Sequence, residues 1–290
     1  MKVHLVDGTY ELFRAFFGVP EARDAAGRPV NAIRGLLATL VSLLHEPGVT
    51  HVACAFDHVI ESFRNELFAG YKTGEGIDAD LLAQFHPAED AMRALGVVVW
   101  PMVEFEADDA LATGALLYRD APGVEQVVLC SPDKDLSQCV VGTRVICRDR
   151  RKRQDRDEDG VVARFGVRPP SIPDWLALVG DTADGIPGVP GFGEKSASAV
   201  LAAHAHIERI PDDPSQWRAD VRGRDRLAAS LRERRKDAYL YRDLATVRTD
   251  VPIAESLADL EWRGARRDEL ATLCDAIGAP EIVDRVRRWA

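Results

Sequence analysis

The first half of the chain alternates short apolar runs with segments in which apolar residues recur at helical spacing. The runs are rich in β-branched residues, as buried strands are. They cover residues 2–6, 51–56, 97–100, 126–130 and 144–147. Between them, segments such as 32–44 and 108–117 repeat apolar residues every three or four positions. Strands that alternate with helices predict an α/β fold with a mostly parallel sheet flanked by helices.

The second half has a different pattern. Strand signals fade after the charged stretch 148–159, and helical segments are interrupted by Pro and Gly at 166–173 and 185–193. The charged stretch is typical of an exposed boundary. We therefore expect an α/β domain over residues 1–150 and a helical region over residues 151–290.

Acidic residues stand at the ends of the apolar runs. Asp7, Asp57 and Asp133 each follow a predicted strand, and ligands bind at the carboxyl ends of the strands in an open parallel sheet. Carboxylates held close together oppose folding unless hard divalent cations neutralise them. The full set is Asp7, Asp57, Glu106, Asp108, Asp109, Asp133, Asp135, Asp181 and Asp184. The pattern predicts a carboxylate site for Mg²⁺ or Mn²⁺.

Each acidic segment has a simpler explanation when it is taken alone. The segment Glu106-Ala-Asp-Asp109 and the pair Asp133-Lys-Asp135 both precede predicted helices, where acidic side chains cap free N–H groups and complement the helix dipole. Asp181 and Asp184 share one face if their segment is helical. Capping does not explain why five separate segments carry acids, so the recurrence favours a metal site.

A glycine-rich stretch, 185–193, runs into a predicted helix over 196–203. Such a turn presents backbone N–H groups at a helix N-terminus and binds phosphate without reading base sequence. The alternative is an ordinary turn between helices that needs positive φ. The preceding Asp181 and Asp184 favour the phosphate site. Its predicted DNA-binding residues are Gly188, Gly191, Gly193, Lys195 and Ser196.

The charge and the cysteines limit where the protein acts and what it binds. The net charge of −10 is unfavourable for binding DNA, but setting aside the nine clustered acids leaves −1. Basic residues gather in 148–156 and 222–242.

The five cysteines show no Cys-x-x-Cys spacing, which indicates a reducing compartment. The longest apolar run, 36–44, is too short for a bilayer. We expect a cytoplasmic protein with no membrane partner.

The motifs together resemble one known family. They are Val6-Asp-Gly, Phe56-Asp57, Ser62-Phe-Arg, Tyr71-Lys72, Glu106-Ala-Asp-Asp109, Asp133-Lys-Asp-Leu136 and Gly180-Asp-Thr-Ala-Asp-Gly-Ile-Pro-Gly-Val-Pro-Gly-Phe-Gly-Glu-Lys-Ser-Ala. In this order and at these spacings, the chain resembles the 5′-3′ exonuclease and flap endonuclease family, including the 5′-nuclease domain of bacterial DNA polymerase I. The likeness covers nearly the whole chain, from residue 1 to at least residue 250.

The resemblance implies a PIN-like sheet, a helix-hairpin-helix-type (H3TH) motif at about residues 172–204, two divalent cations, Mg²⁺ or Mn²⁺, and K⁺ at the glycine-rich turn. It implies that Lys72 stands over the scissile phosphate and that Arg14 lies near the entrance of the active site. The first metal would be surrounded by Asp7, Asp57, Glu106 and Asp108, and the second by Asp133, Asp135 and Asp184, with Asp109 and Asp181 acting through water.

The activity that the resemblance implies is that of a divalent-metal-dependent, structure-specific 5′-3′ exonuclease or flap endonuclease. Such an enzyme hydrolyses DNA phosphodiester bonds in replication or repair. The expected partner is DNA with 5′ flaps, nicks or branches. No polymerase follows residue 290, so we expect any role in repair or Okazaki-fragment processing to require a separate DNA polymerase and ligase. We also expect the protein to be a monomer.

The chain departs from the family pattern after Lys72. Residues 61–90 hold two basic and seven acidic residues, including Glu75, Asp78 and Asp80, where relatives carry a basic arch. We expect weaker action on long single-stranded flaps, because phosphate contacts supply much of the affinity. The alternative function is a DNA junction-binding protein with weak or lost nuclease activity. Retention of nine carboxylates argues against it, since a pure binder has no use for them.

Overall fold

The computed structural model describes residues 1–290, and the chain forms two compact units, each built from separate stretches of sequence. The first unit comprises Met1–Ile60, Gly74–Ser131 and Thr249–Ala290. The second unit comprises Glu61–Thr73 and Pro132–Arg248. The segment that carries Lys72 thus folds with the helical half of the chain.

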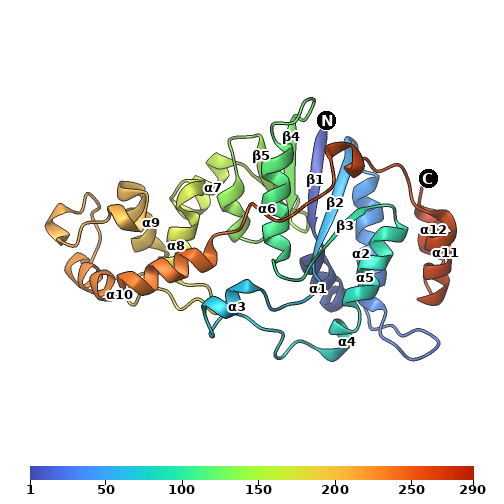
Figure 1. The fold of residues 1–290 in the computed structure, drawn as a ribbon, viewed down its shortest axis with the longest axis horizontal. Coiled ribbons are helices and arrows are strands. Elements are labelled where there is room, and N and C mark those ends of the chain that lie inside the picture. The colour runs from blue at the N-terminus through green and yellow to red at the C-terminus, as the bar shows by residue number, and fades with distance from the viewer. The chain divides into compact units, whose positions relative to one another are not determined.

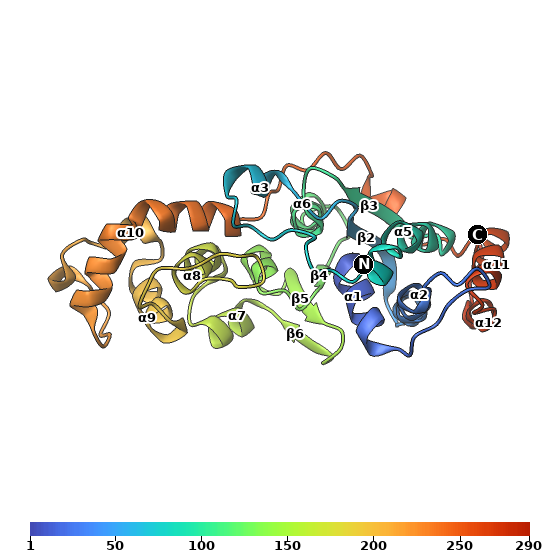
Figure 2. The ribbon, with the colours of Figure 1, turned by 90° about the horizontal axis from the view of Figure 1, so that it is seen from below.

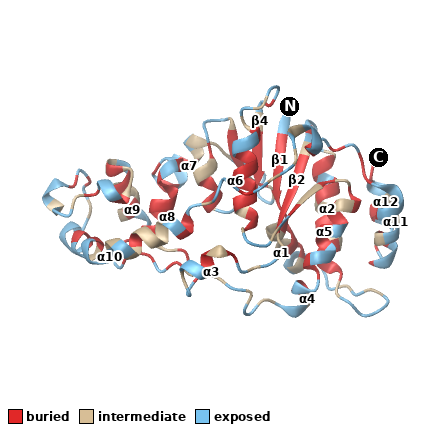
Figure 3. Cartoon of the chain, in the orientation of Figure 1, coloured by how far each residue is buried: buried red, intermediate tan, exposed pale blue.

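The first unit contains a parallel sheet, as the sequence predicts. Strand β1 (Lys2–Asp7) pairs with β2 (Val49–Asp57) and with β4 (Gln126–Cys130), and β2 also pairs with β3 (Val98–Met102), all in parallel. The order of these strands is β3-β2-β1-β4. Strands β1, β2 and β4 are buried along most of their length (Figure 3), which explains their near-continuous apolar sequences.

Helices cover both faces of this sheet. Helix α6 (Ala107–Tyr118) lies on one face, and α1 (Gly8–Gly18) and α2 (Asn31–Leu44) lie on the other (Figures 1 and 2). Helix α5 (Phe85–Ala94) packs against α2 and β3. The unit is completed by α4 (Ala79–Leu82), η5 (Leu257–Leu260), α11 (Arg267–Ala276) and α12 (Glu281–Arg285). The 3.6-residue periodicity seen in 32–44 and 108–117 therefore identifies two of the helices that cover the sheet.

The second unit is mainly helical. Its helices are α3 (Phe63–Leu67), α7 (Glu158–Phe165), α8 (Ile172–Val179), α9 (Glu194–His204) and α10 (Arg224–Ala245), with short 3₁₀ turns η1 (Asp135–Cys139), η2 (Pro169–Ser171), η3 (Ile207–Arg209) and η4 (Pro214–Gln216). The long helix α10 packs against α8, and α8 against α9 (Figure 1).

The charged stretch 148–159 is not simply an exposed boundary. Strand β6 (Gln154–Arg156) forms within it and pairs antiparallel with β5 (Val145–Asp149). The guanidinium of Arg148 donates to both carboxylate oxygens of Asp155, at 2.6 and 2.8 Å. This bidentate cross-strand pair stabilises a strand whose sequence lacks any apolar signal.

A buried arginine holds the segment Glu61–Thr73 within the second unit. Arg64 is 2% exposed, and its guanidinium donates to the carbonyl of Leu244 at 2.9 Å and to that of Thr246 at 3.0 Å. These carbonyls lie at the C-terminus of α10, where a cation complements the helix dipole. Lys72 therefore belongs to a segment that is anchored at the end of the longest helix.

Among the helices of the structure, none combines the length and the apolar character that crossing a membrane requires.

Candidate metal centre and phosphate-binding turn

Two predicted metal ligands end neighbouring strands of the first unit. Asp7 ends β1; its Oδ1 accepts from the backbone N–H of Tyr10 at 2.8 Å, and its Oδ2 accepts from the Ser131 hydroxyl at 2.9 Å. Asp57 ends β2, and its Oδ1 accepts from the backbone N–H of Ala107 at 2.8 Å. Because β1 and β2 are parallel neighbours, both carboxylates lie at one edge of the sheet.

Three further carboxylates stand at the start of α6. Glu106 is the N-cap residue, and its backbone N–H donates to Oδ2 of Asp109 at 3.0 Å. Asp109 is fully buried. Because its side chain accepts this bond, capping explains at least part of its role. The bond from Ala107 to Asp57 fixes this helix start at the end of β2. The structure therefore brings Asp57 to the start of α6, the segment that carries Glu106, Asp108 and Asp109.

The second unit gathers a separate group of carboxylates. One ligand atom each from Asp135, Asp181 and Asp184 lies within 4.8 Å of the others. Asp135 opens η1, and its backbone N–H donates to Oδ1 of Asp133 at 2.8 Å. Four of the nine predicted acids therefore meet in this unit, drawn from two segments far apart in sequence.

The segment that holds Asp181 and Asp184 is a turn and not a helix. Helix α8 ends at Val179, and Asp181 and Ile186 exchange backbone hydrogen bonds of 2.8 and 2.7 Å. Asp181 and Asp184 therefore do not share a helix face, as they would have if their segment were helical. A tight turn aims them at Asp135 instead.

Burial and mutual repulsion make this carboxylate group unfavourable when it is fully ionised. Burial raises the pKa of Asp135 well above its usual value, and the negative charges of Asp133, Asp184 and Asp181 raise it further. Burial also raises the pKa of Asp184, although the Lys72 ammonium opposes this shift. Oδ1 of Asp135 is buried and accepts no hydrogen bond. A buried oxygen that lacks a donor among like charges fits a hard divalent cation.

Two lysines offset part of the negative charge. Nζ of Lys72 lies 2.9 Å from Oδ1 of Asp184, and the Lys72 backbone N–H donates to the Asp184 carbonyl at 3.1 Å. Nζ of Lys134 lies 2.6 Å from Oδ2 of Asp181. Burial by itself would lower the pKa of Lys134, but the hydrogen bond and charge of Asp181 outweigh it and raise the pKa. Lys134 was not identified from the sequence; its position between Asp133 and Asp135 was the available signal.

Glycines allow the turn after α8 to approach other backbone closely. Gly188 has φ +76°, and a Cβ there would lie 2.7 Å from the Val179 carbonyl oxygen. Gly185 has φ +74°, and a Cβ there would lie 2.1 Å from the Gly70 carbonyl oxygen. Here any side chain would push the turn away from the backbone that leads to Lys72.

Three predicted phosphate-binding residues, Gly193, Lys195 and Ser196, lie at the start of α9. Gly191 lies in the turn before the helix, and Gly188 is buried against the end of α8. Gly193 is the N-cap residue, and the Ser196 hydroxyl both accepts from its N–H and donates to its carbonyl, each at 3.0 Å. Gly191, Gly193 and Lys195 are exposed. Ser196 thus caps the helix, while the neighbouring backbone and Lys195 face solvent. Their role toward DNA stays a prediction.

Arg14 lies in the first unit and is held by its own helix. Its Nε donates to Oε2 of the fully buried Glu11 at 2.9 Å, and its Nη2 donates to the Thr39 hydroxyl at 3.0 Å. These bonds fix the direction of the guanidinium. Its role at an active-site entrance stays a prediction.

Replacing Asp135 by asparagine is expected to stabilise the metal-free protein at neutral pH. The pKa of Asp135 is higher in the folded state than the unfolded value of 3.8, so ionisation destabilises the fold. This penalty is absent below the unfolded pKa, grows as the pH rises through the folded pKa, and persists above it. Thermal unfolding in EDTA at acidic and neutral pH measures the difference, which should vanish at the acidic end.

The same variant should gain less stability from Mg²⁺ than the wild type does. A cation that binds only the folded state at 100 times its Kd adds about 2.7 kcal/mol. Asp159→Asn, which changes an exposed acid of α7, is the matched control and should respond like the wild type. An equal Mg²⁺ response in Asp135→Asn and wild type would show that Asp135 does not contact the ion.

Comparison with known families accounts for most of the chain. Residues 2–166 match the family described as 5′-3′ exonuclease, N-terminal resolvase-like domain, and residues 167–268 match 5′-3′ exonuclease, C-terminal SAM fold. DNA polymerase I of Pseudomonas aeruginosa is 36% identical over 295 residues, which cover 99% of this chain and 31% of the relative. DNA polymerase I of Bacillus subtilis is 30% identical, covering 98% and 32%. The chain spans about a third of the length of these relatives.

Solved structures share the fold at lower identity. A mutant of the T5 5′-exonuclease aligns with a TM-score of 0.65 and 17% identity, covering 98% of this chain and 95% of that one. The bacteriophage T5 flap endonuclease, in a pseudo-enzyme-product complex with DNA and metal ions, aligns with a TM-score of 0.66 and 18% identity, covering 98% and 96%. The catalytic core of Rad2 with DNA substrate aligns with a TM-score of 0.63 and 14% identity, covering 98% and 91%.

The parallel sheet with acids at the ends of its strands, together with a helical unit that carries a glycine-rich turn, defines a protein of the 5′-nuclease fold. The two family matches together span residues 2–268. The chain belongs to the 5′-3′ exonuclease family, whose members are nucleases that act on DNA.

Proposed function

We propose that this protein is a structure-specific 5′-nuclease that hydrolyses phosphodiester bonds of DNA with two divalent cations, Mg²⁺ or Mn²⁺. The observation that carries the proposal is the meeting of Asp135, Asp181 and Asp184 around a buried oxygen that lacks a hydrogen-bond donor. The family match supports the same activity.

The proposed ligands follow the two carboxylate groups. Asp133, Asp135 and Asp184 would hold one cation, with Asp181 acting through water. The other would be held by Asp7, Asp57, Glu106 and Asp108, with Asp109 acting through water. When bound, such a pair lowers the pKa of the attacking water and stabilises the charge that develops on the phosphate.

Lys72 is proposed to stabilise the scissile phosphate. Its ammonium lies 2.9 Å from Asp184 and is 32% exposed, so it is held at the carboxylate group and remains reachable by a substrate. If a bound cation neutralised the charge of Asp184, the Lys72 ammonium would be available to the phosphate oxygens. A fixed cation at that place acts most strongly on the charge of the transition state. Arg14 is proposed to assist at the entrance.

The glycine-rich turn is proposed to bind the backbone of duplex DNA. N–H groups at the start of α9, together with Lys195 and Ser196, suit phosphate oxygens, and K⁺ at the turn would add positive charge. We further propose that the protein acts as a cytoplasmic monomer in replication or repair, on flapped, nicked or branched DNA, with a separate DNA polymerase and ligase.

The acidic stretch after Lys72 has structural roles that reduce its free charge. Asp78 is the N-cap of α4 and accepts from the backbone N–H of Asp80 at 2.8 Å, and the Asp80 carboxylate pairs with Arg23. Glu75 is exposed. Weaker action on long flaps stays a prediction, and the stretch is the one feature that favours a junction-binding protein.

The experiment that tests the function is cleavage of a 5′-labelled flap duplex. With Mg²⁺ bound by the carboxylate groups, we expect cutting at the junction and short products with 5′-phosphates. EDTA should abolish cutting, and returning excess Mg²⁺ should restore it. Tight binding of the junction with no cutting in Mg²⁺ or Mn²⁺ would instead support the junction-binding alternative.

A further inference from the structure

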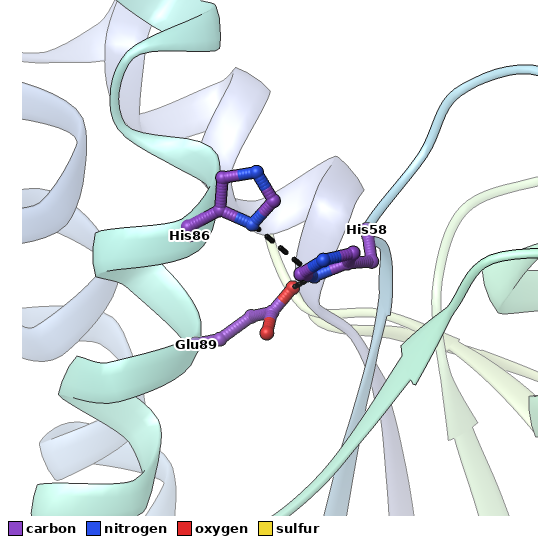
Figure 4. Close-up of side chains that lie close together, drawn as sticks. All are labelled: His58, His86 and Glu89. Atoms are coloured by element: carbon purple, nitrogen blue, oxygen red, sulfur yellow. Dashed lines mark hydrogen bonds and ion pairs between the residues drawn. The ribbon is translucent and has the colours of Figure 1, made fainter.

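Two histidines and a glutamate that belong to neither predicted carboxylate group meet in the first unit (Figure 4). His58 directly follows β2, whereas His86 and Glu89 lie three residues apart on α5 and therefore share a helix face. Nδ1 of His58 lies 2.7 Å from Oε1 of Glu89 and 3.2 Å from Nδ1 of His86. The three atoms all lie within 4.8 Å of one another.

Hydrogen bonding explains this arrangement poorly. A carboxylate only accepts, so Nδ1 of His58 must carry a proton to bond Glu89. That nitrogen then has no lone pair to accept a bond from His86, and one proton must serve both neighbours. A metal cation would instead take a lone pair from all three atoms. Ligands about 2.0–2.1 Å from a tetrahedral Zn²⁺ lie about 3.3 Å apart, close to the 3.2 Å between the ring nitrogens. The 2.7 Å between Nδ1 of His58 and Oε1 of Glu89 is shorter, so these two atoms would move apart by about 0.6 Å when the ion binds.

The surroundings suit a metal site that is open to solvent. The Glu89 side chain is 3% exposed, and its Oε2 accepts from Nη2 of Arg93 at 3.1 Å. This bond orients the carboxylate and leaves Oε1 toward the histidines, as outer partners of metal ligands do. The His58 side chain is 34% exposed and His86 is exposed, so an ion can enter and water can complete its coordination.

We propose that His58, His86 and Glu89 bind one transition-metal cation of the Zn²⁺ class. Imidazole nitrogens suit Zn²⁺, Cu²⁺ and Ni²⁺, whereas Mg²⁺ prefers oxygen, so this site is chemically distinct from the carboxylate groups. Because His58 follows Asp57 and His86 lies on α5, the ion would join the end of β2 to that helix. Because it would bind both His58 and His86, the ion would also close a loop of residues 59–85, the stretch that contains Lys72.

Competition for Zn²⁺ against a chromophoric chelator tests the site. Excess Mg²⁺ is present throughout to occupy the carboxylate groups. The wild type should hold one Zn²⁺ per chain, and His86→Gln and Glu89→Gln should each weaken binding by about 10- to 100-fold or more, the effect expected even for an outer-shell partner. His51→Gln, which changes a histidine hydrogen-bonded to Thr50 in the same unit, is the matched control and should bind like the wild type.

A second readout is independent of the chelator. Zn²⁺ should raise the Tm of the wild type and of His51→Gln, but not that of His86→Gln, because only ions that bind the folded state stabilise it. His86 is exposed, so its replacement should leave the fold intact, and circular dichroism of the metal-free variant checks this. Failure of the wild type to bind Zn²⁺, or equal binding by wild type and His86→Gln, would overturn the proposal.

Discussion

The double variant Asp133→Asn/Asp135→Asn is expected to cleave flap DNA at least about 10³-fold more slowly than the wild type, because a metal's stabilisation of transition-state charge is worth several kcal/mol. Asparagine matches aspartate in size and keeps an oxygen that can accept the 2.8 Å bond from the residue 135 N–H. It removes the two negative charges that attract a cation. Single-turnover cleavage in saturating Mg²⁺ measures the loss.

The fold and DNA binding should survive these changes. Burial and the negative charges of neighbouring carboxylates raise the pKa of Asp135. Neutral replacements remove this repulsion, so they should not unfold the protein. Asp159→Asn serves again as the exposed control. Wild-type cleavage by the double variant, with an intact fold and unchanged DNA affinity, would rule out this carboxylate pair as the holder of a catalytic metal.

Lys72→Ala is expected to slow the chemical step by about 10²- to 10³-fold, the usual effect of removing one group that stabilises transition-state charge. The loss should appear in kcat more than in KM, because the proposed contact strengthens as charge develops on the phosphate. Single-turnover rates at saturating enzyme, with DNA affinity measured separately in Ca²⁺, distinguish the two effects.

The control for this prediction is Lys2→Ala, which removes an exposed lysine at the N-terminal end of β1, the end opposite Asp7. It should cleave like the wild type. If Lys72→Ala also keeps the wild-type rate, then Lys72 acts only as the counter-ion of Asp184 seen at 2.9 Å. In that case the phosphate is stabilised by other groups.

The sequence predicts elements that depend on local pattern. β1, β2 and β4 are found because both faces of these strands are buried, which leaves near-continuous apolar runs. The mostly parallel sheet is confirmed by their pairing. The start of α6 is found because Glu106 and Asp109 cap it, and capping residues act on neighbours in sequence.

Features that depend on contacts between residues far apart in the chain could not be predicted from the sequence. β6 forms in a charged stretch because it pairs with β5 and because Asp155 meets Arg148. Lys134 turns toward Asp181 across a gap of many residues. His58 meets His86 and Glu89 only after the chain has folded. No periodicity encodes such contacts, so the sequence predicted the acidic residues and Lys72 but not the ion pairs that Lys72 and Lys134 make or the meeting of His58 with His86 and Glu89.

The contact between Gly185 and Gly70 couples two parts of the second unit mechanically. Backbone lies against backbone there with no side chain between, and the Lys72 N–H is bonded to the Asp184 carbonyl. The Lys72 carbonyl in turn accepts from Nδ2 of Asn65 at 2.9 Å. Lysine, acidic turn and α3 are thus joined without a flexible link. If the turn binds duplex DNA as proposed, a displacement of the turn would carry the Lys72 backbone with it, and substrate docking would help to place the ammonium.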